Sequence, residues 1–307
     1  MHKIHLAHEM QGHSDFVTAV AMTPRGSRAI SASSDTTLKI WDLEKHTELC
    51  TLRGHTGSVR GAALTRRGHY AVSVSSDKTL RGWDLGDSGN DGVEVHTLRG
   101  HTDAVSGVAI FEPEDFYSGP PRQAVSASFD GTIRLWDLKE GAEPCVIGKH
   151  NGGIYRVVIT EDRQYLLSAP SDKELKVWGL RSLFMGPLNL TGHKHTDDIT
   201  AIAVDRVKPS KTVVTGSIDG TVSVWNLPNT LRYTFEGVGR VLGVATGYGK
   251  SVVVASGDEI SVWDLESHSK EASFKNGDRF YDCAVTQDER TIIAGGEDGI
   301  VYVLHYE

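Results

Sequence analysis

Residues 54–85 read GHTGSVRGAALTRRGHYAVSVSSDKTLRGWDL, and this stretch decides the fold. It opens with Gly-His, closes on Trp-Asp-Leu, and contains three short runs with apolar residues at 59–64, 70–75 and 79–85. Arg-Arg-Gly separates the first two runs, and Ser-Ser-Asp-Lys separates the last two. Short alternating runs with turn residues between them predict an antiparallel meander. One meander cannot bury both of its faces, so the fold requires copies of it.

Related copies of this stretch lie on both sides of it. Five copies share a His, a Ser or Thr, an Asp and a Trp, with the Asp four residues after the Ser or Thr and six before the Trp. The shared residues are His13, Ser31, Asp35 and Trp41; His55, Ser73, Asp77 and Trp83; His101, Ser126, Asp130 and Trp136; His150, Ser168, Asp172 and Trp178; and His195, Thr215, Asp219 and Trp225. A sixth copy ends at Trp263 and has no His, and a seventh has Leu304 in the Trp position.

A repeat of about 40–45 residues with Gly-His and Trp-Asp marks is typical of a WD-repeat propeller blade. On these motifs the chain resembles the WD-repeat (WD40) family over its whole length. The resemblance implies an all-β fold, a seven-bladed propeller of four-stranded antiparallel blades. It also implies that the four shared residues form a hydrogen-bonded chain inside each blade, from Asp to His, from His to Ser or Thr, and from there to the Trp indole.

Asp, His and Ser together could also form a hydrolase triad. A catalytic site is normally built once, whereas this set occurs five times. A buried polar group without a partner costs about 1–3 kcal/mol, so a structural chain of hydrogen bonds explains the repetition. We therefore assign these residues to structure, and predict no catalytic residue. The chain also lacks a phosphate loop, a nucleotide fingerprint and an HExxH motif, so it is not predicted to be an enzyme.

We expect one domain over residues 1–307, with blades at 12–53, 54–99, 100–148, 149–191, 192–236, 237–275 and 276–307. The last blade lacks a fourth strand, and residues 1–11 supply it, because pairing the N-terminal strand there closes the ring and removes an exposed edge. His2, His5 and His8 lie in this strand. Residues three apart alternate faces of a strand, so these side chains are expected to diverge and to form no metal site.

Composition limits the class of protein. The net charge of −8 argues against a general nucleic-acid surface. Cys50, Cys145 and Cys283 are odd in number and far apart, which predicts neither a disulfide framework nor a zinc site. No apolar run reaches 18 residues, and the N-terminus lacks the apolar core of a signal peptide. We expect a reduced, cytoplasmic monomer without cofactor, metal or membrane contact.

The resemblance places binding positions on the top face of the ring, three and five residues after each His and one before each Asp. These positions include Phe16, Arg60, Phe129, Tyr155, Ile218, Arg240, Arg279 and Tyr281. Aromatic side chains and Arg are favoured in protein-binding hot spots. The sequence therefore predicts a protein or peptide partner on this face, and the arginines suit an acidic one.

Two alternatives stay open. The first is a small-ligand binder or an enzyme that uses the central channel, which channel carboxylates with strongly shifted pKa values would favour. The second is partner binding through bottom-face insertions at residues 86–92, 112–121 and 180–187, where Phe116, Tyr117, Phe184 and Met185 lie.

The amino-acid sequence of two segments also indicates the kind of parent protein. Residues 19–44, AVAMTPRGSRAISASSDTTLKIWDLE, and residues 283–307, CAVTQDERTIIAGGEDGIVYVLHYE, are similar to bacterial WD-repeat domains. Such domains are often C-terminal sensor regions of multidomain signalling proteins, including NACHT or NB-ARC NTPases and caspase-like or TIR proteins. The resemblance implies a non-catalytic scaffold or sensor module.

Overall fold

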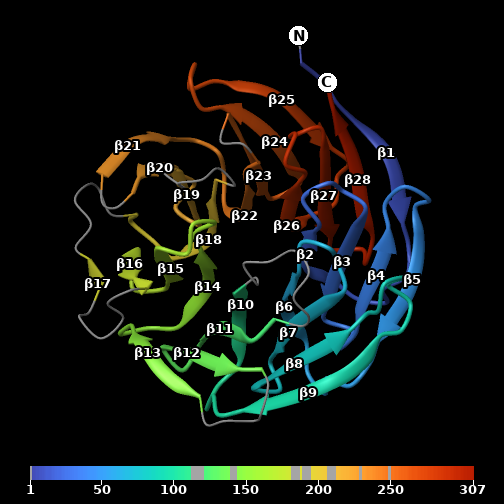
Figure 1. The fold of residues 1–307 in the computed structure, drawn as a ribbon. Coiled ribbons are helices and arrows are strands. Elements are labelled where there is room, and N and C mark those ends of the chain that lie inside the picture. Colours follow the sequence, from blue (N-terminus) through green and yellow to red (C-terminus); the bar gives the residue numbers. More distant parts are fainter. Residues whose placement is uncertain are drawn as a thin grey trace.

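The chain forms seven four-stranded antiparallel sheets arranged as a ring around a central channel (Figure 1). The computed structural model describes residues 2–111, 121–138, 144–180, 187–188, 195–205, 212–227, 230–247 and 250–307. The predicted seven-bladed propeller is confirmed. The described part of the chain contains no helix that is long and apolar enough to cross a membrane.

Each blade consists of strands that follow one another from the channel outward. Blade 1 contains β2 (Val17–Met22), β3 (Arg28–Ser33), β4 (Leu38–Asp42) and β5 (Thr47–Leu52). Blade 2 contains β6 (Val59–Leu64), β7 (Tyr70–Ser75), β8 (Thr79–Asp84) and β9 (Val93–Arg99). Blade 3 contains β10 (Val105–Phe111), β11 (Gln123–Ser128), β12 (Thr132–Asp137) and β13 (Cys145–Lys149). Blade 4 contains β14 (Ile154–Ile159), β15 (Tyr165–Pro170), β16 (Lys176–Gly179) and β17 (Pro187–Leu188).

The remaining blades follow the same plan. Blade 5 contains β18 (Ile199–Val204), β19 (Thr212–Ser217), β20 (Val222–Asn226) and β21 (Thr230–Phe235). Blade 6 contains β22 (Val241–Ala245), β23 (Ser251–Ser256), β24 (Glu259–Asp264) and β25 (Lys270–Lys275). Blade 7 contains β26 (Phe280–Val285), β27 (Thr291–Gly296), β28 (Val301–Tyr306) and β1 (Ile4–Met10).

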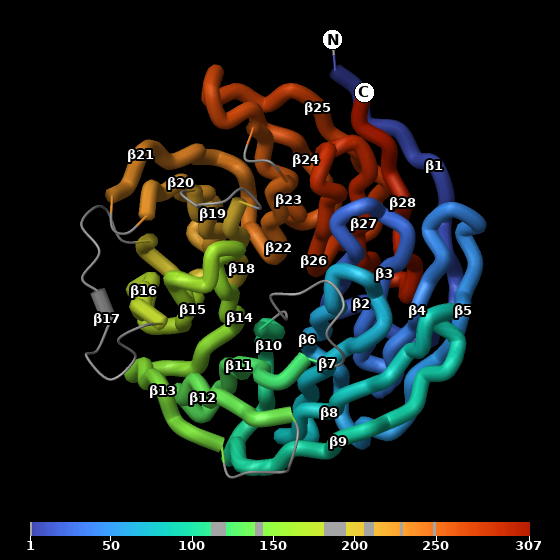
Figure 2. The backbone as a smooth tube through the Cα atoms, in the orientation of Figure 1, coloured from blue at the N-terminus to red at the C-terminus, as the bar shows by residue number. Residues whose placement is uncertain are grey.

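The N-terminal strand closes the ring. β1 is the outer strand of blade 7 and pairs antiparallel with β28, so the two ends of the chain lie side by side (Figure 2). The backbone N–H of Lys3 donates to the carbonyl oxygen of Glu307 at 2.9 Å. Met10 is buried in the apolar cluster between blades 7 and 1, together with Trp41 and Val303. The closing strand therefore contributes to the core as well as to the ladder.

A bulge in β1 corrects one sequence prediction. The pairing shifts between Leu6 and His8, so that His5 lies opposite His305 and His8 lies opposite Val303. Residues 303 and 305 share a face of β28, and the histidines at 5 and 8 therefore lie on one face instead of diverging. The His8 ring stacks on His46 with centroids 3.5 Å apart. Among the described residues, no group of three or more His, Cys, Asp or Glu side chains is placed to hold a metal ion.

A second bulge recurs in the first strand of all seven blades and shapes the top face. In each blade the pairing between the first and second strands shifts after the first residue, so that the second residue has no partner. These unpaired residues are Thr18, Arg60, Ser106, Tyr155, Thr200, Leu242 and Tyr281. A bulge bends its strand and re-aims the extra side chain, and here it does so where each first strand starts at the channel mouth.

Candidate functional site

The repeated polar residues form hydrogen-bond chains in the interior of five blades. In blade 1, His13 Nδ1 lies 2.8 Å from Asp35 Oδ2, His13 Nε2 lies 2.7 Å from Ser31 Oγ, and the Trp41 indole N–H donates to Ser31 Oγ at 2.8 Å. Blades 2 to 4 repeat this arrangement around Ser73, Ser126 and Ser168. In blade 5 the His195 imidazole contacts Thr221 and Thr215, with Asp219 at 3.4 Å.

Burial and the partners set the ionisation of these groups. Burial lowers the pKa of His13, His55, His101, His150 and His195, although the neighbouring aspartates offset part of this effect. Burial acts in the opposite direction on the pKa of Asp77 and Asp130, but hydrogen bonds from a Thr, the His and backbone N–H groups lower the pKa of both to about 2. The histidines are neutral and the aspartates charged at neutral pH.

Sequence reasoning missed a fifth member of these chains. A Thr two residues after the Asp donates its hydroxyl to the Asp Oδ1 at 2.6 Å in blades 1, 2, 3 and 5, through Thr37, Thr79, Thr132 and Thr221. The signal was present in the sequence, because Thr occupies this position in four of the five copies. Blade 4 has Glu174 there.

The last two blades replace the chain with other contacts. In blade 6 the Trp263 indole N–H donates to Ser261 at 2.9 Å. In blade 7 the Tyr302 hydroxyl donates to Asp298 at 2.6 Å, and its ring packs edge-on against the buried Phe280. Neither contact offers a nucleophile beside a His base.

The seven bulge residues divide into two groups. Thr18, Ser106 and Thr200 turn their hydroxyls toward the next blade and donate to the carbonyl oxygen of the first residue of its first strand, at 2.6 Å for Thr200 and Val241. These three side chains tie neighbouring blades together. The bulge positions of blades 2, 4, 6 and 7 have larger side chains, and three of them, Arg60, Tyr155 and Tyr281, are members of the predicted site.

One aromatic pair spans the seam between blades 7 and 1. The Phe16 ring stacks on the Tyr281 ring with centroids 5.6 Å apart and planes 20° apart. Phe16 remains 39% exposed. Arg279 is 68% exposed in its side chain, and its Nε lies 3.9 Å from Glu297. We name Phe16, Tyr281 and Arg279 the seam cluster.

A second cluster lies on blades 2 to 4, on the same face of the ring. The Arg60 guanidinium lies 5.3 Å from the centre of the Phe129 ring, within cation–π distance, and its Nε donates to Ser76 Oγ at 2.6 Å. The Tyr155 ring meets Phe129 edge-on at 5.4 Å, and its hydroxyl donates to Asp198 at 2.7 Å. Burial, followed by that carboxylate, raises the pKa of Tyr155 to about 12. We name Arg60, Phe129 and Tyr155 the cation cluster.

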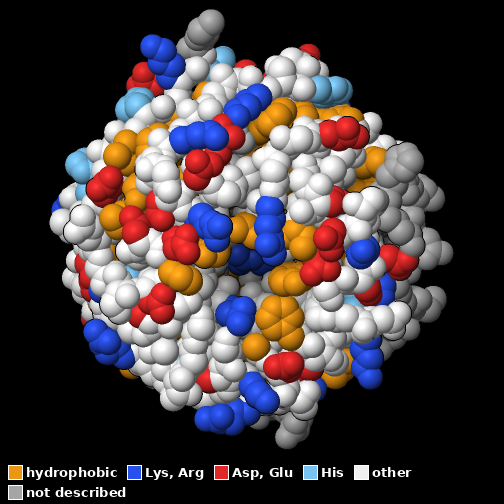
Figure 3. Space-filling model, turned by 180° about the vertical axis from the view of Figure 1, so that it is seen from behind, with side chains coloured by type: hydrophobic (Ala, Val, Ile, Leu, Met, Phe, Trp, Pro, Cys, Tyr) orange, Lys and Arg blue, Asp and Glu red, His pale blue; other side chains and the backbone are white. Residues whose placement is uncertain are grey.

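The other predicted residues lie on the same face without joining either cluster through a direct contact. Arg240 is exposed, and its charge acts on Tyr155. Ile218 is half-buried, and its backbone N–H donates to the Asp198 carbonyl oxygen at 3.2 Å. Figure 3 shows Lys and Arg side chains gathered around the hollow at the centre of this face, with hydrophobic side chains among them.

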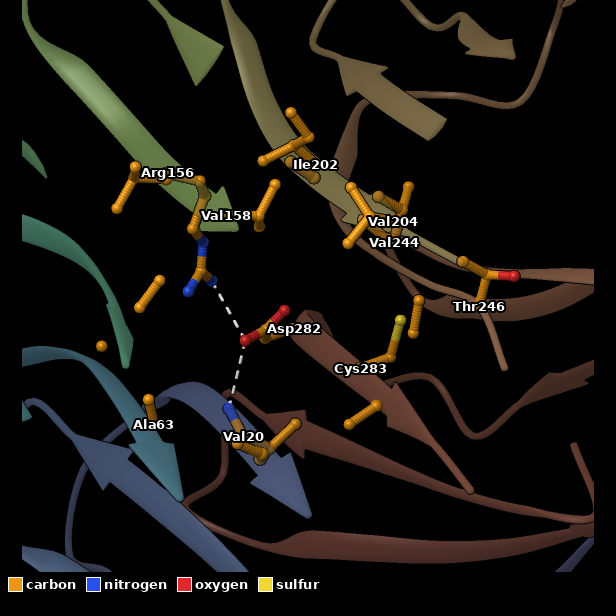
Figure 4. Close-up of a pocket in the computed structure, with 18 of the residues that line it drawn as sticks. Val20, Ala63, Arg156, Val158, Ile202, Val204, Val244, Thr246, Asp282 and Cys283 are labelled. Carbon is orange, nitrogen blue, oxygen red and sulfur yellow. Dashed lines mark hydrogen bonds and ion pairs between the residues drawn. The ribbon is translucent and has the colours of Figure 1, made fainter. Parts of the chain in front are cut away.

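An ion pair crosses the channel just below this face. Arg156 Nη2 from β14 lies 3.0 Å from Asp282 Oδ2 of β26, and the backbone N–H of Val20 donates to the same oxygen at 3.1 Å (Figure 4). Burial raises the pKa of Asp282, although Arg156 and the backbone N–H groups counteract the rise. The channel here is a cavity of about 350 Å³ lined by the first strands of the seven blades. Sequence reasoning missed this pair, because blades 4 and 7 are not neighbours.

One of the three bottom-face insertions lies within the described residues. The connection at residues 86–92 packs against blade 1, where the Arg28 guanidinium donates to the Asp87 carbonyl oxygen and Cys50 Sγ lies 3.4 Å from the Gly89 carbonyl oxygen. The insertions at 112–121 and 180–187 fall almost entirely outside the described residues, as do Phe116, Tyr117, Phe184 and Met185.

Comparison with known proteins agrees with the repeat pattern. The model of the WD domain, G-beta repeat, family (WD40) matches residues 5–42, 46–84, 92–137, 143–179 and 187–226. The chain is 26% identical to human apoptotic protease-activating factor 1 over 62% of this chain and 16% of that protein. It is 27% identical to target of rapamycin complex subunit wat1 of Schizosaccharomyces pombe over 60% of each. It is 30% identical to nuclear distribution protein PAC1 of Arthroderma otae over 86% of this chain and 62% of that protein. The matches therefore span less than two thirds of each of these relatives.

Proposed function

Because this chain belongs to the WD40 repeat family, we propose that it is a protein-interaction module that binds a protein or peptide on its top face. The names of two relatives support this proposal, since one is a subunit of a complex and another is an activating factor. The region of the human relative that matches this chain is also a small part of that protein, 16% of its length. We propose that the module acts in the same way, as a scaffold or sensor within a longer signalling protein of the cytoplasm.

The seam cluster is the observation that carries the proposal. A large aromatic side chain such as Phe16, exposed beside a second ring and the exposed Arg279, gives contact area together with a polar handle, which hot spots favour. The cation cluster repeats this chemistry on blades 2 to 4. The two clusters lie around the same channel mouth, so one bound segment can touch both. The arginines favour an acidic partner.

The chemistry of the described residues supports a module without catalysis of its own. The His, Asp and Ser residues that could form a triad are hydrogen-bonded inside the blades, and the His side chains at 13, 55, 101 and 150 have no exposed surface. A second candidate, a ligand in the central channel, is favoured by the shifted pKa of Asp282. A bacterial host protein and a monomeric state remain predictions.

The test is capture of partners from lysate by wild type and by the double variant Arg279→Ala/Tyr281→Ala, followed by titration of each purified partner. Tyr281 and Arg279 are exposed or half-buried, so the variant is expected to keep the wild-type melting temperature. We expect it to bind its partner at least about tenfold more weakly, since a hot-spot residue contributes ~2 kcal/mol or more.

The matched control is Glu44→Ala/Lys45→Ala, an exposed pair in the turn between β4 and β5 at the opposite end of the strands. It should bind like wild type. Equal binding by a folded Arg279→Ala/Tyr281→Ala variant would move the site away from the seam cluster, and loss of binding in the control alone would place it on the bottom face.

A further inference from the structure

We propose that the mouth of the channel is a subsite for a carboxylate side chain of the bound partner, and that Arg156 is the residue that holds it. The proposal rests on the proposed function and names the chemistry of its partner: a peptide segment that lies across the top face and directs one Asp or Glu side chain into the channel.

Arg156 lies where a side chain from the top face can reach it. It follows Tyr155 of the cation cluster directly in β14, so its guanidinium enters the channel one residue below the top face (Figure 4). The side chain keeps 23% of its surface exposed. Close packing of the first strands fixes the strand that carries it, because a Cβ at Gly107 would lie 2.9 Å from Arg156 Cα. The guanidinium is therefore held in the open channel by a rigid strand.

The Arg156 guanidinium has more hydrogen-bond donors than its contact with Asp282 uses. Arg156 uses Nη2 for Asp282, and among the described residues no other carboxylate lies within ion-pair distance of it. Arg has five N–H donors in a planar fork, so one edge remains free for a second carboxylate. Asp282 also accepts from the Val20 N–H, which anchors it independently. Asp282 is thus the positioning residue, and the free edge of Arg156 faces the cavity of about 350 Å³.

Two further arginines lie near the mouth of the channel. Neither Arg60 nor Arg240 forms an ion pair with a described residue, so both guanidinium groups are available to a carboxylate of the partner. The hydrogen bond from the Tyr155 hydroxyl holds the Asp198 carboxylate in place without removing its charge. These two guanidinium groups favour an anion beside them even though the whole chain has a net charge of −8. The two aromatic pairs around the same channel mouth offer apolar contact for the flanking residues of a peptide.

The experiment uses display of random nonapeptides, selected in parallel on wild type, on Arg156→Gln and on Arg279→Ala/Tyr281→Ala. We expect wild type to enrich Asp or Glu at one position, and Arg156→Gln to lose that preference while keeping the flanking preferences. The best peptide is then synthesised with Glu and with Gln at that position. Wild type should bind the Glu form at least tenfold more tightly, and Arg156→Gln should bind both forms equally.

Asp282→Asn separates a binding role from a structural one. It keeps the shape and the contact with Val20 but removes the negative charge beside Arg156, so the Glu peptide should bind severalfold more tightly than to wild type. If the pair only braces the ring, Arg156→Gln and Asp282→Asn will both weaken binding, and the proposal fails. Melting temperatures of both variants establish that they are folded.

The remaining outcomes are also decisive. Peptides that depend on Arg279 and Tyr281 but show no acidic position would overturn the carboxylate subsite and leave the proposed function standing. If no peptide is enriched on wild type, both the carboxylate subsite and the proposed function are contradicted. If succinate alone binds wild type as tightly as the Glu peptide, the subsite serves a free small acid, and the peptide as its occupant is wrong.

Discussion

Ser31 determines the protonation of the imidazole beside it. The Trp41 indole can only donate, so Ser31 Oγ accepts from it and gives its own proton to His13 Nε2. His13 therefore has its proton on Nδ1, where it donates to Asp35. One hydroxyl thus satisfies two buried rings, and the same argument applies to the Ser or Thr of the next four blades.

Ser31→Ala tests this arrangement. The substitution leaves His13 Nε2 and the Trp41 indole N–H without partners in a fully buried site, and each such group costs about 1–3 kcal/mol. We expect the free energy of unfolding to fall by about 2–6 kcal/mol in urea titrations. The control is Ser14→Ala in the same blade, where the side chain is exposed, and it should change stability by less than about 0.5 kcal/mol. A loss as small as that of the control would show that the chain of hydrogen bonds contributes nothing.

The blades were largely predictable from the sequence. Ser, Asp and Trp of each repeat lie on one antiparallel hairpin, which fixes their spacing. The bulges were not predictable. The three hydroxyl residues Thr18, Ser106 and Thr200 occupy the same position as Tyr155 and Tyr281, and only the bulge geometry shows that the former bond the next blade. The bulge in β1 likewise overturned the expected divergence of His5 and His8.

Deletion of residues 1–10 tests the role of β1 as an element. It removes the ladder with β28 and the buried Met10 side chain. Burial of a Met is worth about 1.5–3 kcal/mol, and each lost hydrogen bond about 0.5–1.5 kcal/mol. We expect a loss of at least about 3 kcal/mol and a lower melting temperature. Deletion of residues 1–2 alone, which precede β1, should leave both nearly unchanged. An unchanged melting temperature for the longer deletion would show that ring closure does not depend on this strand.

For the whole molecule, the five buried histidines act together and make stability depend on pH. Their pKa values are lowered in the folded state, so the unfolded chain takes up protons first as the pH falls below 6.5. Unfolding is therefore favoured by up to ~1.4 kcal/mol per His for each pH unit, until the folded pKa is reached. The aspartates add a second loss between pH 3.8 and about 2.

We expect the free energy of unfolding to be constant above pH 7.5 with respect to these groups and to fall by at least about 2 kcal/mol between pH 7.5 and 5.5. Urea titrations at pH 7.5, 6.5 and 5.5 measure it. The variant Ser31→Ala changes the surroundings of His13, one of the five histidines. The slope of its free energy of unfolding against pH should therefore differ from that of wild type. Stability that rises on acidification would mean that the histidines are protonated in the folded protein.

Part of the candidate site could be predicted from the sequence. The sequence identified Phe16, Phe129, Tyr155 and Tyr281, because the family pattern places them by their spacing from His and Asp. It could not pair Arg156 with Asp282, which are 126 positions apart and belong to non-adjacent blades. Only the closed ring brings these two strands to opposite sides of one channel. Contacts within a repeat follow from spacing, whereas contacts across the ring require the complete assembly.

The pairing of β1 with β28 has a consequence for synthesis on the ribosome. The first strand of the ring to emerge waits for the last strand of the ring, and until then its hydrogen-bonding edge and the side chain of Met10 lack the partners that they have in the closed ring. The growing protein is an open arc whose two free blade surfaces, on blade 1 and on the newest blade, are apolar. Translation speed and chaperone binding in that interval decide whether the arc closes on itself or meets the arc of another nascent chain.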